Sequence, residues 1–162
     1  MAEHAASDGS AYLRLARRML GWRDGAEDAC QAAFLKACAR PDEIDGDRLA
    51  AWLRRVVVNE CLQRMRVRRT AERHREGVAR RLSDSGVDPT SDSVARDDEV
   101  VWLLDRLDPD LRAVVVMRVM EGISGKQTAE ALGVSQSVAS RRLHRAMTQL
   151  RALHRLQEPS HE

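Results

Sequence analysis

Residues 128–146, TAEALGVSQSVASRRLHRA, place two helical segments on either side of a very short turn. Gly133 can take the left-handed backbone conformation that such a turn needs and that a side chain would penalise. Ala129 is small, which lets two helices approach closely. We therefore predict a tight helix-turn-helix unit in this part of the chain. The apolar residues expected to close its core are Leu132, Val134 and Leu143.

Both helices of this unit carry start signals. Ser124 and Gln127 form a Ser-x-x-Gln capping box, and Ser135 caps a second helix that we expect to reach about Leu156. Such a unit can set its second helix in the major groove of DNA; a basic helical hairpin with no DNA role is the alternative. The side chains of that helix that could reach bases or phosphates are Gln136, Ser137, Ser140, Arg141, Arg142, His144 and Arg145.

The remaining sequence also favours helix, so we predict an all-α fold. Apolar residues make up 43% of the chain and aromatic residues only 3%, which predicts an aliphatic core. Val56–Val58 could pass for a strand, but the 3.6-residue apolar spacing around it favours helix. Further helices are expected over Tyr12–Gly21, Ala26–Ala39, Arg48–Arg69 and Val94–Leu107, and the third of these extends or frays over 70–81. Another helix is expected from Pro109 to Gly122, with Asp108 as its cap.

Charge divides the chain into alternating blocks. Residues 48–81 hold eleven arginines and three glutamates, whereas residues 82–110 hold nine acidic and two basic residues. Ser83–Ser93, SDSGVDPTSDS, lacks periodicity and is expected to be a flexible acidic linker. The pattern predicts two small helical domains whose basic surfaces face a polyanion; ordinary solvated helix faces are the alternative.

Two helices before the linker combine a buried face with a polar one. The second expected helix carries a mixed polar and apolar patch, and the third carries a hydrogen-bonding stripe at i, i+4 and i+7. A plain solvated face is the alternative for each. The patch consists of Asp28, Gln31 and Leu35, and the stripe consists of Asn59, Gln63 and Arg66. The expected buried face of the second helix consists of Ala29, Cys30, Ala33, Phe34 and Ala37. The expected buried face of the third helix consists of Leu49, Trp52, Leu53, Val56, Val57 and Cys61.

Two segments together carry a family resemblance. GAEDACQAAFLKAC (residues 25–38) and LAAWLRRVVVNECLQRMRVRR (residues 49–69) resemble region 2 of bacterial sigma factors of the extracytoplasmic-function group, in the sigma-70 family. LDPDLRAVVVMRVMEGISGKQTAEALGVSQSVASRRLHRAMTQLR is similar to region 4 of that family. The resemblance covers most of residues 12–155. The matching region 2 positions are Ala26, Glu27, Asp28, Gln31, Phe34, Trp52, Leu53, Asn59 and Arg66.

The resemblance implies a protein without catalytic chemistry that directs core RNA polymerase to promoters. It implies region 2 over residues 10–81, a linker over 82–94 and region 4 over 95–157. The patch on the second helix would bind the β′ clamp helices, region 4 would bind the −35 element and the β flap, and an inhibitory anti-sigma partner is expected. The residues implied at the −10 element are Arg54, Arg55, Asn59, Gln63 and Arg66, with Arg64 adding phosphate attraction.

Some segments depart from the family pattern. The loop Asp42–Asp47 would hold a base flipped from the non-template strand, but Arg48 and Leu49 replace aromatic residues common nearby, so we expect weak stacking. Ser137–Arg142 replaces the usual Gly-Thr-Val-Lys-Ser-Arg, so the −35 DNA sequence that this chain recognises cannot be inferred from other members of the family. The acidic residues that could mimic phosphates in polymerase channels, or simply belong to a spacer, are Asp84, Asp88, Asp92, Asp97 and Asp98.

Composition disfavours several other functions. The five histidines are scattered, and we expect no metal and no cofactor. Cys30 and Cys61 are expected in the core, and Cys38 is the better candidate for a redox role. The sequence shows no apolar segment of membrane-spanning length and no export signal, which predicts a cytoplasmic protein without membrane insertion. Two alternatives remain: a helix-turn-helix regulator whose first module dimerises, and a degenerate sigma factor that titrates an anti-sigma factor.

Overall fold

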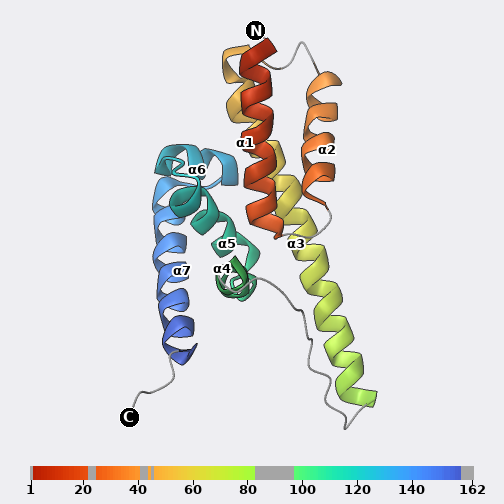
Figure 1. Ribbon diagram of the computed structural model, residues 1–162, viewed down its shortest axis with the longest axis vertical. Coiled ribbons are helices and arrows are strands. Elements are labelled where there is room, and N and C mark those ends of the chain that lie inside the picture. Colours follow the sequence, from red (N-terminus) through yellow and green to blue (C-terminus); the bar gives the residue numbers. More distant parts are fainter. Residues whose placement is uncertain (1, 22–24, 41–43, 45, 83–96, 158–162) are drawn as a thin grey trace.

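A computed structural model describes residues 2–21, 25–40, 44, 46–82 and 97–157 of the 162-residue protein (Figure 1). These residues form helices and turns, with no strand among them, which confirms the all-α prediction. In chain order the elements are α1 (Ala2–Leu20), α2 (Ala26–Cys38), the 3-10 turn η1 (Gly46–Arg48), α3 (Leu49–Leu82), α4 (Asp97–Asp105), α5 (Pro109–Val115), the π-helical turn η2 (Val116–Met120), α6 (Gly125–Leu132) and α7 (Gln136–Gln157).

Helices α1, α2 and α3 pack against one another as a first group. The short side chains of Ala29 and Ala33 are buried on α2, so this helix can lie close to its neighbours. Tyr12 ties the group together, because its hydroxyl donates to the carbonyl oxygen of Ala50 at 3.0 Å. The ring of Tyr12 also meets that of Phe34 edge to face, with centroids 6.3 Å apart.

The second group runs from α4 to α7 and contains the predicted helix-turn-helix as α6 and α7. The backbone nitrogen of Gln127 donates to Ser124 Oγ at 3.2 Å, and that of Ser124 donates to Gln127 Oε1 at 3.3 Å. Gly133 ends α6 with a φ of +65°, and Val138 N donates to Ser135 Oγ at 3.3 Å. The capping box, the glycine turn and the second serine cap are therefore all confirmed.

The two groups pack directly on each other. Helix α3 contacts α5 and α6 as well as α1 and α2, and α1 contacts η2. Figure 1 shows the second group lying beside α1 and α3. Buried side chains of both groups form one continuous hydrophobic core. Because α3 has neighbours from both groups, Val58 and Leu62 are buried beyond the predicted stripe.

Several predicted details are wrong. Helix α1 begins at Ala2, ten residues before the predicted start at Tyr12. Leu49 and Phe34, predicted to be buried, are 38% and 37% exposed, because each lies at the edge of the apolar stripe of its helix. Asp108 is the N-cap of α5 as predicted, and its backbone carbonyl accepts from the backbone nitrogens of Leu111 and Arg112, but its carboxylate makes no capping hydrogen bond and pairs with Arg69 instead.

Other predictions are met only in part or cannot be compared. Helix α3 continues to Leu82, so the basic extension over 70–81 is helical. The expected linker Ser83–Ser93 lies outside the described residues, and with it Asp84, Asp88 and Asp92. Residues 42, 43 and 45 of the expected base-holding loop also lie outside them.

Candidate nucleic-acid interface

The first candidate surface is the polar stripe of α3. Asn59, Gln63 and Arg66 recur once per helical turn and are all exposed, as predicted. Arg55 is exposed one turn earlier and Arg54 is half-buried. Hydrogen-bonding groups spaced along one helix face, with guanidinium groups beside them, are suited to contact with bases and phosphates.

The second candidate surface is the first half of α7. The cap at Ser135 fixes where this helix begins, and most of the predicted contact residues after it are exposed. Ala139 and Ala146 are buried on the opposite side, which holds the helix against the rest of its group. The exposed residues are Gln136, Ser137, Ser140, Arg141, His144 and Arg145, whereas Arg142 is half-buried.

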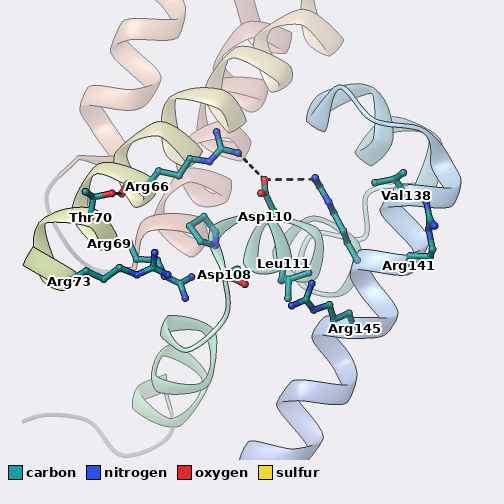
Figure 2. Close-up of a pocket in the computed structure, with 12 residues that line it drawn as sticks. Arg66, Arg69, Thr70, Arg73, Asp108, Asp110, Leu111, Val138, Arg141 and Arg145 are labelled. Atoms are coloured by element: carbon teal, nitrogen blue, oxygen red, sulfur yellow. Dashed lines mark hydrogen bonds and ion pairs between the residues drawn. The ribbon is translucent and has the colours of Figure 1, made fainter.

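The two candidate surfaces face each other across the junction between the groups. Side chains from α3 and α7 line one cavity of about 690 Å³ together with the start of α5 (Figure 2). A second cavity, of about 640 Å³, brings Arg54 and Arg55 of α3 to the same space as Gln136 of α7. The two groups therefore lie against each other in this structure, with an arginine-bearing helix of each group beside the junction.

An aspartate at the start of α5 bridges the two surfaces. Asp110 Oδ1 accepts from Arg66 Nη2 of α3 at 2.9 Å and lies 3.7 Å from Arg142 Nη1 of α7. Figure 2 shows both ion pairs converging on this carboxylate. Asp108, two residues earlier, pairs with Arg69. One carboxylate therefore lies within ion-pair distance of an arginine from each candidate surface.

A second set of ion pairs holds α1 to the turn after η2. The side chain of Glu121 is 6% exposed, and its Oε1 accepts from Arg18 Nη1 at 2.6 Å. Its Oε2 accepts from Arg14 Nε at 3.1 Å. The same Arg18 nitrogen donates to the carbonyl oxygen of Met120 at 2.7 Å. Charge-assisted hydrogen bonds to a carboxylate withdrawn from water are stronger than exposed ones, so this set stabilises the packed arrangement.

Arg112 adds a buried cation at the same junction. It is 5% exposed, pairs with Asp105, and donates from Nη2 to the carbonyl oxygen of Arg18 at 3.3 Å. Sequence reasoning missed Arg112, Glu121 and the role of Asp110. The contacts of Arg112 with Arg18, of Glu121 with Arg18 and of Asp110 with Arg66 join residues far apart in the sequence, and helical periodicity does not predict such pairings.

The mixed patch on α2 is a third candidate surface. Asp28, Gln31 and Leu35 are all exposed, as expected for a surface that receives a partner. Leu35 is 63% exposed, although it lies on a helix whose other side is buried. A single exposed leucine is common on protein surfaces, so its meaning depends on the polar groups beside it.

Arg64, expected to attract phosphates, has a different contact. Its Nη1 donates to Glu60 Oε2 at 2.6 Å, and Lys36 Nζ of α2 donates to Glu60 Oε1 at 2.5 Å. The hydrogen bond from Lys36, followed by that from Arg64, lowers the pKa of Glu60 against the opposing effect of burial. This part of α3 is therefore tied to α2, and phosphate attraction by Arg64 stays a prediction.

The cysteines divide as expected. Cys30 and Cys61 are buried and Cys38 is exposed. Burial, followed by the neighbouring Cys30, raises the pKa of the Cys61 thiol to about 12, and burial also raises the pKa of Cys30. Among the described residues, no group of three His, Cys, Asp or Glu side chains could hold a metal ion. Within the same ranges, no helix is both long enough and apolar enough to cross a membrane.

Known families account for most of this architecture. Residues 7–71 match the family described as Sigma-70 region 2, and residues 98–150 match Sigma-70, region 4. The RNA polymerase sigma-E factor of Streptomyces avermitilis is 36% identical over 150 residues, covering 92% of this chain and 82% of that protein. The ECF RNA polymerase sigma factor SigM of Mycobacterium tuberculosis is 35% identical over 144 residues, covering 86% of this chain and 69% of that protein.

Two solved structures share the fold. One is the sigma factor RpoE in complex with the anti-sigma factor NepR from Bartonella quintana, with a TM-score of 0.68 and 25% identity over 96% of this chain and 97% of that one. The other is CnrH in complex with the cytosolic domain of CnrY, with a TM-score of 0.69 and 28% identity over 97% of this chain and 88% of that one. Both likenesses extend across the two helical groups.

A helical chain that carries a region 2 and a region 4, each with an arginine-bearing helix at its surface, is a transcription initiation factor of the sigma class. Such factors bind RNA polymerase and promoter DNA and have no catalytic chemistry of their own. The chain belongs to the extracytoplasmic-function group of the sigma-70 family, and it directs core RNA polymerase to promoters. The alternative of a helix-turn-helix regulator from another class does not fit this membership.

Proposed function

We propose that the exposed stripe of α3 binds the −10 element of a promoter and that the first half of α7 binds the −35 element. The exposure of Asn59, Gln63 and Arg66 along one face supports the first assignment. The exposure of Gln136, Ser137, Ser140, Arg141, His144 and Arg145, with Arg142 half-buried behind them, supports the second. Arg54 and Arg55 extend the α3 stripe with phosphate contacts.

The patch on α2 is the proposed contact with the clamp helices of the polymerase. Asp28, Gln31 and Leu35 are exposed together on a helix whose opposite side packs into the core. An exposed leucine flanked by hydrogen-bonding groups is suited to a partner surface with an apolar centre and a polar rim. On the resemblance to the two family regions, region 2 would span residues 10–81, the linker 82–94 and region 4 95–157. Region 4 would also contact the β flap.

The packed arrangement is a form that must open before promoter binding. The observation that carries this proposal is the shared carboxylate of Asp110, which binds Arg66 of one candidate surface and lies beside Arg142 of the other. A recognition helix needs a groove about 12 Å wide to itself. Because Asp110 holds an arginine of each candidate surface, we infer that the two groups separate before a duplex reaches both surfaces.

An anti-sigma factor is the proposed partner of the packed form. The support is the likeness, over 96% of this chain, to a sigma factor solved in complex with one. A protein that binds the two packed groups and not the separated ones would lower promoter binding by mass action. A protein that acts on core polymerase and promoter DNA would work in the cytoplasm, which we propose as its location.

Promoter-specific run-off transcription with core polymerase tests the DNA assignments. Asn59→Ala and Arg141→Ala each remove one proposed contact, and we expect roughly tenfold less transcript for each, because one base or phosphate contact contributes about 1–3 kcal/mol. Arg75→Gln is the matched control, because Arg75 is an exposed arginine of α3 outside the proposed stripe. Equal transcript from all three variants would refute the assignments and leave the family membership intact.

A further inference from the structure

The cavity between α3 and α7 is lined by a dense set of arginines. Three come from successive turns of α3 and three from two successive turns of α7, and both helices line the same space (Figure 2). The cavity has a volume of about 690 Å³, within the range of small-molecule sites. The arginines are Arg66, Arg69 and Arg73 of α3, and Arg141, Arg142 and Arg145 of α7.

The lining carries more positive charge than its own acids balance. Among the described residues, the lining holds six arginines and two acidic residues, Asp108 and Asp110, so four of its positive charges are not balanced. Asp110 contacts Arg66 and Arg142, and Asp108 contacts Arg69. No ion pair is present for Arg73, Arg141 or Arg145 within the described part of the chain.

Packing the two groups together therefore costs electrostatic repulsion at this point. Guanidinium groups on facing helices repel one another, and two carboxylates offset only part of that repulsion. An anion that contacts both walls of the cavity would offset the rest of this repulsion. Because Arg73 lies on one wall and Arg141 and Arg145 on the other, the anion must be long enough to offer oxygens on two sides.

The chemistry of the lining selects the class of anion. All six cations are arginines, whose planar forks each offer paired donors to phosphate or carboxylate oxygens. The surplus calls for on the order of four negative charges in a small volume. A short chain of phosphates meets both conditions, whereas a duplex does not fit and an acidic peptide spreads its charge along a bulkier backbone.

We propose that the packed form of this sigma factor binds a small polyphosphate anion, such as inorganic tripolyphosphate or the triphosphate of a nucleotide, between α3 and α7. The anion bridges Arg73 on one wall to Arg141 and Arg145 on the other and holds the two groups together. It binds the packed form and not the separated one, so it opposes promoter binding through the linkage of the two equilibria. The expected opposition to promoter binding rests on the proposed DNA surfaces, whereas the binding of the anion does not.

Calorimetric titration of the full-length chain with sodium tripolyphosphate tests the binding directly. We expect one site per chain, and about tenfold weaker binding when Arg73→Gln is combined with Arg145→Gln, since two charge-assisted contacts are lost. The matched control combines Arg75→Gln with Arg151→Gln, which removes the same charge from the same two helices outside this cavity. We expect the control to bind within about twofold of wild type, at matched ionic strength.

Four outcomes would overturn the proposal: absence of saturable binding, equal loss in the control, equally tight binding of orthophosphate, or tighter binding of a short single-stranded DNA or an acidic peptide. Circular dichroism of both double variants checks that each folds. Titration with a nucleoside triphosphate distinguishes the sources, because tighter binding than tripolyphosphate assigns the site to a nucleotide and equal binding assigns it to the phosphate chain. Saturable tripolyphosphate binding with failed transcription would refute the promoter roles and leave this site standing.

Discussion

Arg18 and Glu121 lie 103 residues apart in the chain, yet Arg18 Nη1 is 2.6 Å from Glu121 Oε1. Arg18 belongs to α1 of the first helical group, and Glu121 follows η2 of the second. The carboxylate is withdrawn from water, and Arg14 binds its other oxygen. This contact joins the two groups without involving either candidate DNA surface, so it can be altered separately from them.

Glu121→Gln is expected to loosen the packed arrangement. The change removes the charge that two arginines share, and we expect a loss of roughly 1–3 kcal/mol in the free energy of unfolding. Small-angle scattering should show a larger radius of gyration for the variant at neutral pH. Promoter DNA should bind the free variant more tightly than wild type, because more of the chain is open.

Glu27→Gln is the matched control for that variant. Glu27 pairs with Arg17 at 3.1 Å, but both side chains are largely exposed, so the pair contributes well under 1 kcal/mol. The control should keep the radius of gyration of wild type. An unchanged radius for Glu121→Gln, together with unchanged DNA binding, would mean that Glu121 does not hold the groups together.

Glu60→Gln tests how acid acts on the contact between α2 and α3. The hydrogen bonds from Lys36 and Arg64 lower the pKa of Glu60 below its ordinary 4.5 in the folded chain. The stabilisation is therefore fully present above the ordinary carboxyl range and is lost as the pH falls through the lowered folded-state pKa. Urea unfolding should show the variant about 1 kcal/mol less stable at pH 7, with the difference shrinking under acid.

The comparison for Glu60 is Glu72→Gln. Glu72 pairs with Arg68 at 2.7 Å within α3 and is more exposed, so its loss should cost only a few tenths of a kcal/mol. A difference between Glu60→Gln and wild type that stays constant from pH 7 into the acid range would contradict the assigned cause.

Local signals predicted the helices well because those signals act within a few residues. The Ser124–Gln127 box, the Gly133 turn and the Ser135 cap depend only on their own neighbourhood, and all three form as predicted. The exposed stripe of α3 followed from periodicity for the same reason. The start of α1 was missed because its first turns carry small and polar residues without an apolar rhythm.

Gly133→Ala tests the turn between α6 and α7. The φ of +65° is one that an alanine adopts at a cost of about 1–2 kcal/mol. Thermal unfolding should show that loss, and binding through α7 should weaken as the turn distorts. Gly125→Ala is the control, because Gly125 lies in α6 without a positive φ and an added methyl meets its nearest neighbour at 4.0 Å. Equal stability of the two variants would contradict the assigned strain.

Alkylation separates the three cysteines by burial. Cys38 is exposed, whereas Cys30 and Cys61 are buried thiols whose pKa values are raised. Iodoacetamide at pH 8 should modify Cys38 in the native chain and leave the other two unmodified until the chain is unfolded. Mass spectrometry of the digested protein measures this, and early modification of Cys61 would contradict the packing of α3.

The packing of the two groups could not be predicted from the sequence. Asp108 looks like a helix cap by its position, and only the tertiary structure brings Arg69 to it. Arg112 occupies a helix position that reads as solvent-facing, and it is buried because a second group of helices covers it. Ion pairs between distant segments depend on the fold as a whole, so no short sequence motif predicts them.

A measurement of the distance between the two helical groups would show whether they separate during transcription. Fluorophores on the exposed Cys38 of α2 and on Ala152→Cys of α7 would report it by energy transfer, since both positions lie at the surface. We expect one short distance in the free chain and a clearly longer one when core polymerase and promoter DNA are present and transcript is made. The same short distance in the transcribing complex would contradict the claim that the groups must separate.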